Sequence, residues 1–201
     1  AVFVHRDNPL TGITIEQIDR IFSAHALCGQ HPQITRWEQV GLMEQWTHKP
    51  IDVLGRDSRS GSYSFFKDVA LCSGAFRTDM QILPGSGSIV QAISNNINAI
   101  GFSGIGYKTS GVRTLAIIQH EKMTLPNISA DTNWDYPLAR FLYLYVNKPP
   151  NKPLPPLLRE FMLLVLSNTG QHIVELDGYA AVSETVIKAN LQKLAIPLNK
   201  N

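Results

Sequence analysis

The chain has 201 residues, of which 44% are hydrophobic and 17% charged, a composition typical of globular proteins. Its formal net charge of +2 is too small to indicate binding to nucleic acid or to an anionic membrane surface. No apolar run approaches the roughly 20 residues that span a bilayer, so no membrane insertion is expected.

Apolar runs predict strands at residues 1–5, 51–54, 99–102, 112–118 and 138–146. Apolar residues at helical spacing predict helices after Thr14, after the residues 55–62, after the residues 83–88, at residues 157–166, from Gly170, and at residues 183–194. Residues 119–137 are polar and are expected to be irregular. Strands that alternate with helices indicate an α/β fold with a mostly parallel sheet.

Local signals set some of the boundaries of these elements. Thr14 and Gln17 have the spacing of a capping box at the start of the first helix. Gly74 is where the second helix is expected to end, because glycine readily adopts the left-handed conformation there. The two cysteines, Cys28 and Cys72, lack CxxC spacing; they either pair, if the protein is exported, or are two semi-buried thiols.

The clearest functional signal is the segment of residues 55–62, Gly-Arg-Asp-Ser-Arg-Ser-Gly-Ser, between a buried strand and a helix. The N-terminus of a helix has unpaired N–H groups and partial positive charge, and serine and glycine let a small oxyanion approach them. Arg56 adds a planar fork of donors. The segment predicts a site for phosphate or a similar oxyanion; the alternative is an arginine in a surface ion pair beside an ordinary capped helix.

Four further residues are candidates to line a cleft around this oxyanion site: Asp57, Ser86, Ser88 and Tyr107. Each also has a purely structural interpretation. Asp57 either orients Arg56 or caps its loop. Ser86 and Ser88 belong to a second helix start and either face the cleft or only cap the helix. Tyr107 either lines the mouth of the cleft or packs as an ordinary aromatic. Arg59 is expected to be a solvated loop charge.

Other chemistry has little support in the sequence. The six histidines show neither HExxH nor a paired metal spacing, so no metal site and no cofactor are predicted. The chain has no GxSxG nucleophile elbow and no GxGxxG dinucleotide loop. Residues 1–4 are too short for the apolar core of a signal peptide, but a mature exported protein lacks one too, so this leaves the compartment open.

The order and spacing of short motifs over nearly the whole chain resemble the periplasmic phosphate-binding proteins of ABC-type phosphate transporters. Among the matching pieces are Asn8-Pro9-Leu10, the Gly55-Arg56-Asp57-Ser58 and Ser60-Gly61-Ser62 runs, and residues 14–18, 35–37, 65–67, 99–107, 136–138, 165–167, 170–171 and 178–179. In this family the Arg-x-x-x-Ser-Gly-Thr segment donates to the phosphate oxygens. The resemblance therefore implies that Arg56, Ser60, Gly61 and Ser62 bind phosphate, with Ser62 keeping the hydroxyl of the usual threonine.

The resemblance implies a type II periplasmic binding protein-like α/β fold, with one complete lobe built on a mixed or parallel sheet plus the C-terminal part of a second lobe. Residues 1–5 are then a hinge strand, residues 6–135 the complete ligand-binding lobe, and residues 136–201 a second hinge strand and the C-terminal part of the other lobe. Family members carry a further segment before the part that matches residue 1, so this chain is expected to lack the N-terminal segment.

The implied function is non-catalytic capture of inorganic phosphate by a periplasmic or extracellular protein that delivers it to the membrane subunits of an ABC transporter. Two alternatives stay open. One is a binder of another oxyanion, or an extracellular phosphate sensor or adhesion protein on the same lobes. The other is an enzyme acting on phosphate esters, which would need a metal cluster or a nucleophile triad that the sequence does not show.

Overall fold

The computed structural model describes residues 1–29, 31–127 and 135–196. These residues form two compact units. The first unit contains residues 1–126 and 135–139, and the second contains residue 127 and residues 140–196. The site predicted from the sequence lies entirely in the first unit.

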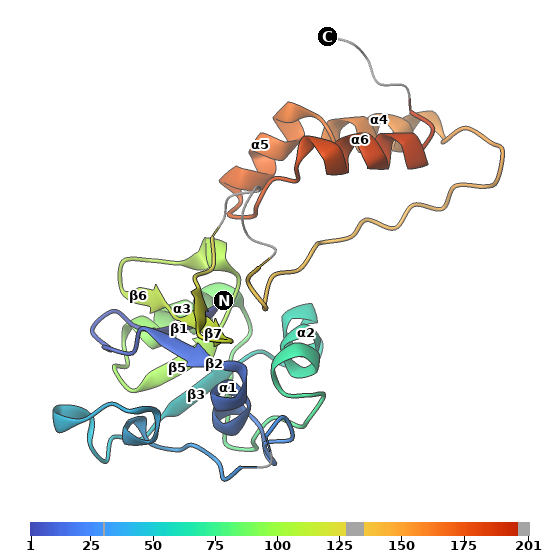
Figure 1. Ribbon diagram of the computed structural model, residues 1–201. Helices are drawn as coiled ribbons and strands as arrows, with labels where there is room; N and C mark the ends of the chain where they lie inside the picture. Colours follow the sequence, from blue (N-terminus) through green and yellow to red (C-terminus); the bar gives the residue numbers. More distant parts are fainter. Residues whose placement is uncertain (30, 128–134, 197–201) are drawn as a thin grey trace. The chain divides into compact units, whose positions relative to one another are not determined.

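A five-stranded mixed sheet forms the centre of the first unit (Figure 1). Its strands, in spatial order, are β4 (Gln81–Ile82), β3 (Asp52–Gly55), β5 (Ala99–Phe102), β1 (Val2–His5) and β6 (Val112–Thr114). Strand β3 is parallel to both β4 and β5, whereas β1 is antiparallel to both β5 and β6. The expected α/β fold with a mixed or parallel sheet is confirmed.

Helices pack on both faces of this sheet because successive strand residues point to opposite sides. Val2 and Val4 of β1 belong to the larger apolar core, which also contains buried residues of two helices, whereas Phe3 belongs to a second core built on a third helix. The two helices of the larger core are α1 (Ile15–Phe22) and α2 (Gly61–Ala70), and the third is α3 (Ser86–Ser94). Short 3-10 helices occur at Trp37–Val40 (η1), Glu44–Trp46 (η2) and Ile105–Tyr107 (η3).

A second, three-stranded sheet was only partly expected. It consists of β2 (Gly12–Thr14), β7 (Ala116–Gln119) and β8 (Lys122–Thr124), in the order β2-β7-β8. Residues 112–118, predicted as one strand, are divided between the two sheets at Leu115, whose N–H donates to the carbonyl of Val2. Strand β8 lies in a stretch that was predicted to be irregular. The turn before it has His120 and Glu121 in left-handed conformations (φ 46° and 66°). Asn-Gly is the usual sequence for such a turn, so this one gave no signal of a hairpin.

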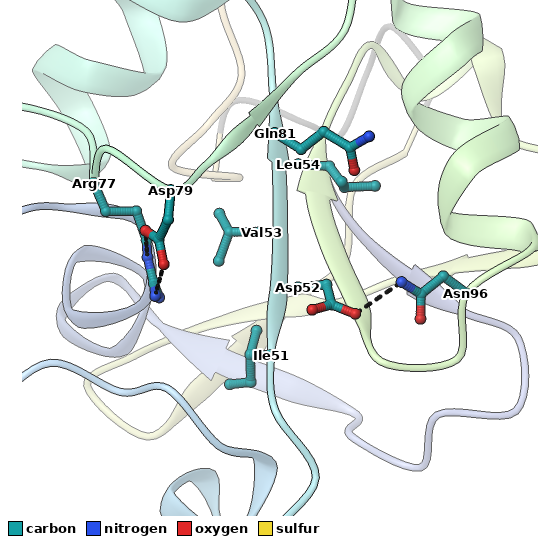
Figure 2. A pocket seen from close by; sticks show the side chains of 8 residues that line it. All are labelled: Ile51, Asp52, Val53, Leu54, Arg77, Asp79, Gln81 and Asn96. Carbon is teal, nitrogen blue, oxygen red and sulfur yellow. Dashed lines mark hydrogen bonds and ion pairs between the residues drawn. The ribbon is translucent and has the colours of Figure 1, made fainter.

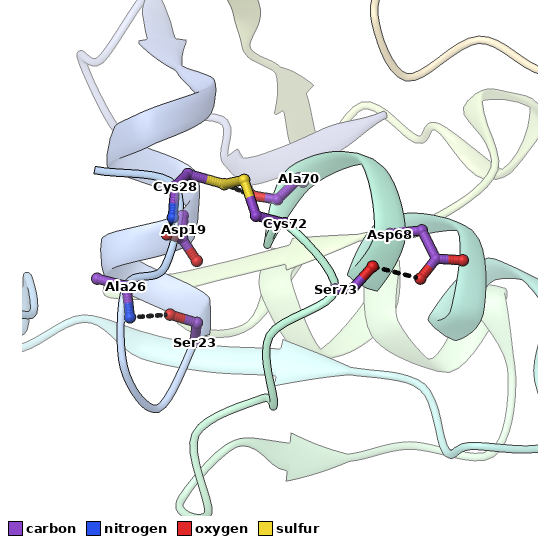
Figure 3. Close-up of a disulfide and its surroundings, with 8 residues drawn as sticks. All are labelled: Asp19, Ser23, Ala26, Cys28, Asp68, Ala70, Cys72 and Ser73. Atoms are coloured by element: carbon purple, nitrogen blue, oxygen red, sulfur yellow. Dashed lines mark hydrogen bonds between the residues drawn. A yellow bond between two sulfur atoms is a disulfide. The ribbon is translucent and has the colours of Figure 1, made fainter. Parts of the chain in front are cut away.

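A disulfide joins Cys28, in the loop after α1, to Cys72, just beyond α2 (Figure 3). The buried carboxylate of Asp19 accepts a hydrogen bond from the Cys28 N–H at 2.7 Å, which fixes the backbone on one side of the bond. On the other side, Cys72 and Ser73 are both left-handed (φ 48° and 60°), and α2 therefore ends at Ala70 rather than near Gly74. The disulfide thus ties the end of α2 to the region that follows α1.

The second unit contains three helices, α4 (Pro156–Val165), α5 (Asn168–Leu176) and α6 (Glu184–Lys193). Their small core consists of Leu154, Met162, Leu191 and Ile196. Gly170 allows α5 to start directly against the end of α4, because a Cβ there would lie 1.9 Å from the carbonyl oxygen of Leu164. All three helices were predicted: the predicted ends of α4 and α6 agree within one residue, and the predicted start of α5 agrees within two.

The strand predicted at residues 138–146 is absent from the structure. Leu138 is buried in the core of the first unit, but residues 142–145 are exposed, Tyr145 to 95%. A strand is held by hydrogen bonds to a neighbouring strand, and the described part of the second unit contains only helices. The apolar sequence therefore has no ladder to join. The role of residues 1–5 and 141–146 as the two hinge strands stays a prediction.

We expect the disulfide to stabilise the first unit by about 4 kcal/mol, because it closes a loop between cysteines 44 residues apart and so restricts the unfolded chain. A reductant should lower the unfolding temperature of the wild type but leave that of a Cys28→Ser/Cys72→Ser variant unchanged. Two free thiols, found by labelling the unreduced and denatured protein, would show that the bond does not form.

Candidate functional site

The predicted site residues lie where three parallel strands end. Gly55 of β3 is opposite Ile82 of β4, and Leu54 is opposite Gly101 of β5, so the chain leaves the three strands at the same level. Helix α2 follows β3 and helix α3 follows β4, so both helices begin at this edge of the sheet. Ligands of parallel sheets typically bind at the carboxyl ends of the strands, next to such helix N-termini.

A serine side chain caps the first turn of α2. Ser60 is the N-cap residue, is buried, and accepts a hydrogen bond from the Ser62 N–H at 3.2 Å. The Ser62 N–H is therefore already engaged, whereas the Ser60 hydroxyl still has a proton to donate. Gly61 occupies the first helical position and leaves it without a side chain.

Among the four residues predicted to bind phosphate, Arg56, Ser60, Gly61 and Ser62, only Arg56 has a formal charge, and the structure leaves most of its donors uncommitted. One guanidinium nitrogen, Nη1, donates to the hydroxyl of Ser86 at 3.2 Å. The Nε–H is buried and has no acceptor among the described residues. No carboxylate in the described part of the chain forms an ion pair with Arg56. The carboxylate of Asp57 is near enough for Coulombic attraction but does not bond to Arg56, and a partly buried cation without a bonded carboxylate favours binding of an anion.

Asp57 is committed to Arg59 and not to Arg56. Its Oδ1 accepts from the Arg59 N–H at 2.9 Å, and its Oδ2 accepts from Arg59 Nη2 at 3.0 Å. The side-chain and backbone hydrogen bonds from Arg59 lower the pKa of Asp57. The side chain of Arg59 is 89% exposed. Of the two roles considered for Asp57, the structure thus supports capping of the loop.

The two candidate serines at the start of α3 differ in their contact with Arg56. Ser86, the first residue of α3, lies next to Arg56 through the hydrogen bond described above, but Ser88 shows no bond to Arg56 among the described contacts. Tyr107 is 47% exposed, and its ring lies beside Gly104 and Gly87, at the same edge of the sheet.

Ser103 was not singled out as a site residue, although it follows the buried strand β5 directly. It is only 5% exposed, and its hydroxyl donates to the backbone carbonyl of Ser86 at 3.1 Å. A serine directly after a wholly buried strand was the only signal in the sequence for this contact.

A separate pocket of about 300 Å³ lies along β3, away from these residues (Figure 2). Four of its polar side chains pair with one another: Asp52 accepts from Asn96 at 2.8 Å, and Arg77 forms an ion pair with Asp79 at 2.5 Å. None of the predicted site residues lines it; its lining consists of Ile51, Asp52, Val53, Leu54, Arg77, Asp79, Gln81 and Asn96. Because its lining has two carboxylates, Asp52 and Asp79, and its arginine is already paired with Asp79, we do not consider this pocket a site for an anion.

Two other kinds of feature are missing from the described residues. They contain no group of three or more His, Cys, Asp or Glu side chains arranged to hold a metal ion. None of their helices is both long enough and apolar enough to cross a bilayer.

Arg56 and the serines near it place hydrogen-bond donors at the strand ends of a mixed α/β sheet, the edge where ligands of such sheets typically bind. Comparison with known families shows which kind of fold this is. The model of the PBP superfamily domain matches residues 1–169. The chain belongs to the PBP superfamily.

Individual relatives are phosphate-binding proteins by name. The chain is 47% identical, over 98% of its length, to the phosphate-binding protein PstS of Pseudomonas aeruginosa, of which it covers 61%. The crystal structure of PstS from Borrelia burgdorferi is 25% identical, with a TM-score of 0.62, over 90% of this chain and 68% of that one. An ABC-type phosphate transport receptor from Vibrio cholerae shares the fold, with a TM-score of 0.64 and 23% identity over 90% of this chain and 68% of that one. The chain thus spans about 61% of the length of the curated relative from Pseudomonas.

The pairing of Asp57 with Arg59 predicts that the Asp57 carboxyl titrates below the usual pKa of about 3.9. A lowered pKa in the folded state means that the pair stabilises the loop above the unfolded pKa, and that this contribution disappears as the pH falls through the folded pKa. NMR titration of the side-chain carboxyl should show the low value, and Arg59→Ala should raise it. A wild-type pKa at or above 3.9 would contradict the assignment.

Proposed function

We propose that this protein is an extracytoplasmic solute-binding protein that captures inorganic phosphate, without catalysis, for the membrane subunits of an ABC transporter. The observation that carries the proposal is Arg56, a partly buried guanidinium with no carboxylate partner in the described chain, placed where three parallel strands end and two helices begin. The names of the relatives support phosphate as the ligand.

The proposed contacts follow from the donors at this edge. Arg56 would supply charge-assisted hydrogen bonds, and the hydroxyls of Ser60 and Ser62, at the positive end of the α2 dipole, would donate to the anion. All of these groups donate, which matches an anion rich in acceptor oxygens. Gly61 would let the anion approach the helix closely.

Binding without chemistry fits the composition of the site. The residues assembled there include no activated nucleophile and no general base, since Asp57 is held as a low-pKa carboxylate by Arg59. The disulfide between Cys28 and Cys72 supports an oxidising compartment outside the cytoplasm. Both features support a transport role rather than hydrolysis of phosphate esters.

We predict that Arg56→Ala weakens phosphate binding by about 2 to 5 kcal/mol in the natural protein that contains this chain, because a charge-assisted pair in a desolvated site is lost. Arg59→Ala is the matched control: it removes the same charge three residues away, from a side chain that contacts Asp57. Its loss should be below about 1 kcal/mol. Calorimetry should measure the loss of phosphate affinity in each of the two variants. Equal losses would show that Arg56 is not the binding arginine.

Competition with other oxyanions tests the choice of ligand. If phosphate is the ligand, sulfate and molybdate at equal concentration should not displace it from the wild type. Displacement by either of them would favour the alternative, a binder of another oxyanion on the same fold.

A further inference from the structure

We propose that Ser86 and Ser103 are positioning residues of the site: Ser103 fixes the first turn of α3, and Ser86 holds the Arg56 guanidinium toward the ligand. This inference rests on the proposed function, because it concerns how the binding arginine is oriented. Neither serine is required to touch the ligand in this account.

The start of α3 leaves the Ser86 hydroxyl available for Arg56. The N-cap position is occupied by Gly85, which has no side chain, and no side-chain hydrogen bond caps the helix. Ser86 follows at the first helical position, one residue beyond the place where serine normally caps a helix. Its hydroxyl instead accepts from Arg56 Nη1 at 3.2 Å.

Ser103 links this helix turn to the sheet. It is buried, directly follows β5, and donates its N–H to the carbonyl of Ala1 at 3.0 Å. Its hydroxyl donates to the carbonyl of Ser86 at 3.1 Å. The backbone of Ser86, and with it the hydroxyl that meets Arg56, is therefore held by a residue anchored in the central sheet.

The two bonds matter for binding because an arginine has a long side chain with many rotamers. Restricting it at the moment of binding costs conformational entropy, whereas a guanidinium that is already oriented does not incur this cost. The bond to Ser86 uses one N–H of Nη1 and leaves the others for an anion. The nearby carboxylate of Asp57 does not compete, since Arg59 holds both of its oxygens.

The test compares Ser86→Thr with Ser86→Val in the natural protein that contains this chain, with inorganic phosphate as the probe in calorimetry. The two side chains have nearly the same shape, but only threonine keeps the hydroxyl. Ser86→Val should bind phosphate about three- to tenfold more weakly, the range expected for one hydrogen bond, and Ser86→Thr should bind nearly as well as wild type. Ser94→Ala, at the other end of α3, is the control and should leave the affinity unchanged.

A double-mutant cycle separates positioning from a general structural effect. In an Arg56→Ala background, Ser86→Val should cause no further loss of affinity, since there is no guanidinium left to orient. Ser103→Ala should weaken binding in the wild type, with little further loss once Ser86→Val is present. Phosphorus NMR can follow the weakest binders.

Two different failures can be told apart. If Arg56→Ala leaves phosphate affinity unchanged, the proposed function has the wrong arginine. If Arg56→Ala weakens binding but the valine and threonine variants bind alike, or if the valine effect persists without Arg56, the positioning role of Ser86 is wrong while the proposed function stands. Ser86→Ala, a smaller change, gives the same readout should the valine variant fold poorly.

Discussion

The parallel pairing of β3 with its two neighbours is the constraint on which the rest of the site depends. Because β4 and β5 run in the same direction as β3, all three chains turn away from the sheet at one edge. The turns there carry Arg56, Ser86 and Ser103, which are far apart in the sequence. An antiparallel neighbour would have placed one of these turns at the opposite edge.

The distribution of charge at this edge is as specific as its geometry. The loop after β3 contains two arginines and one aspartate, and an ion pair between Arg56 and Asp57 would have neutralised the site. The structure instead closes the loop with Arg59 on both oxygens of Asp57, which leaves Arg56 bonded only to a neutral hydroxyl.

Signals within single short stretches of sequence were sufficient to predict several elements of the fold and of the site. The strand Ala99–Phe102 has the predicted bounds, the Thr14 capping box forms, and α2 begins within the segment chosen from Arg56, Ser60 and Gly61. Each of these depends on local apolar spacing or capping chemistry. The same local chemistry indicated that Asp57 either caps its loop or orients Arg56, but not which.

What the sequence did not indicate depended on distant partners. Residues 140–146 have the composition of a strand but no neighbouring strand in the described part of their unit, and β8 formed where no turn signal was visible. The contact of Ser103 with Ser86 joins the end of a strand to a helix 17 residues earlier, a pairing that no single stretch of sequence can show. Register and side-chain partners of this kind are set by the tertiary fold.

The most direct test of the central claim is a crystal structure of the natural protein with bound phosphate. The account predicts phosphate oxygens within hydrogen-bond distance of the Arg56 guanidinium and of the first turn of α2, with the Asp57–Arg59 pair intact. Phosphate bound elsewhere, for instance in the pocket lined by Arg77 and Asp79, or an Arg56 that pairs with Asp57 in the complex, would contradict it.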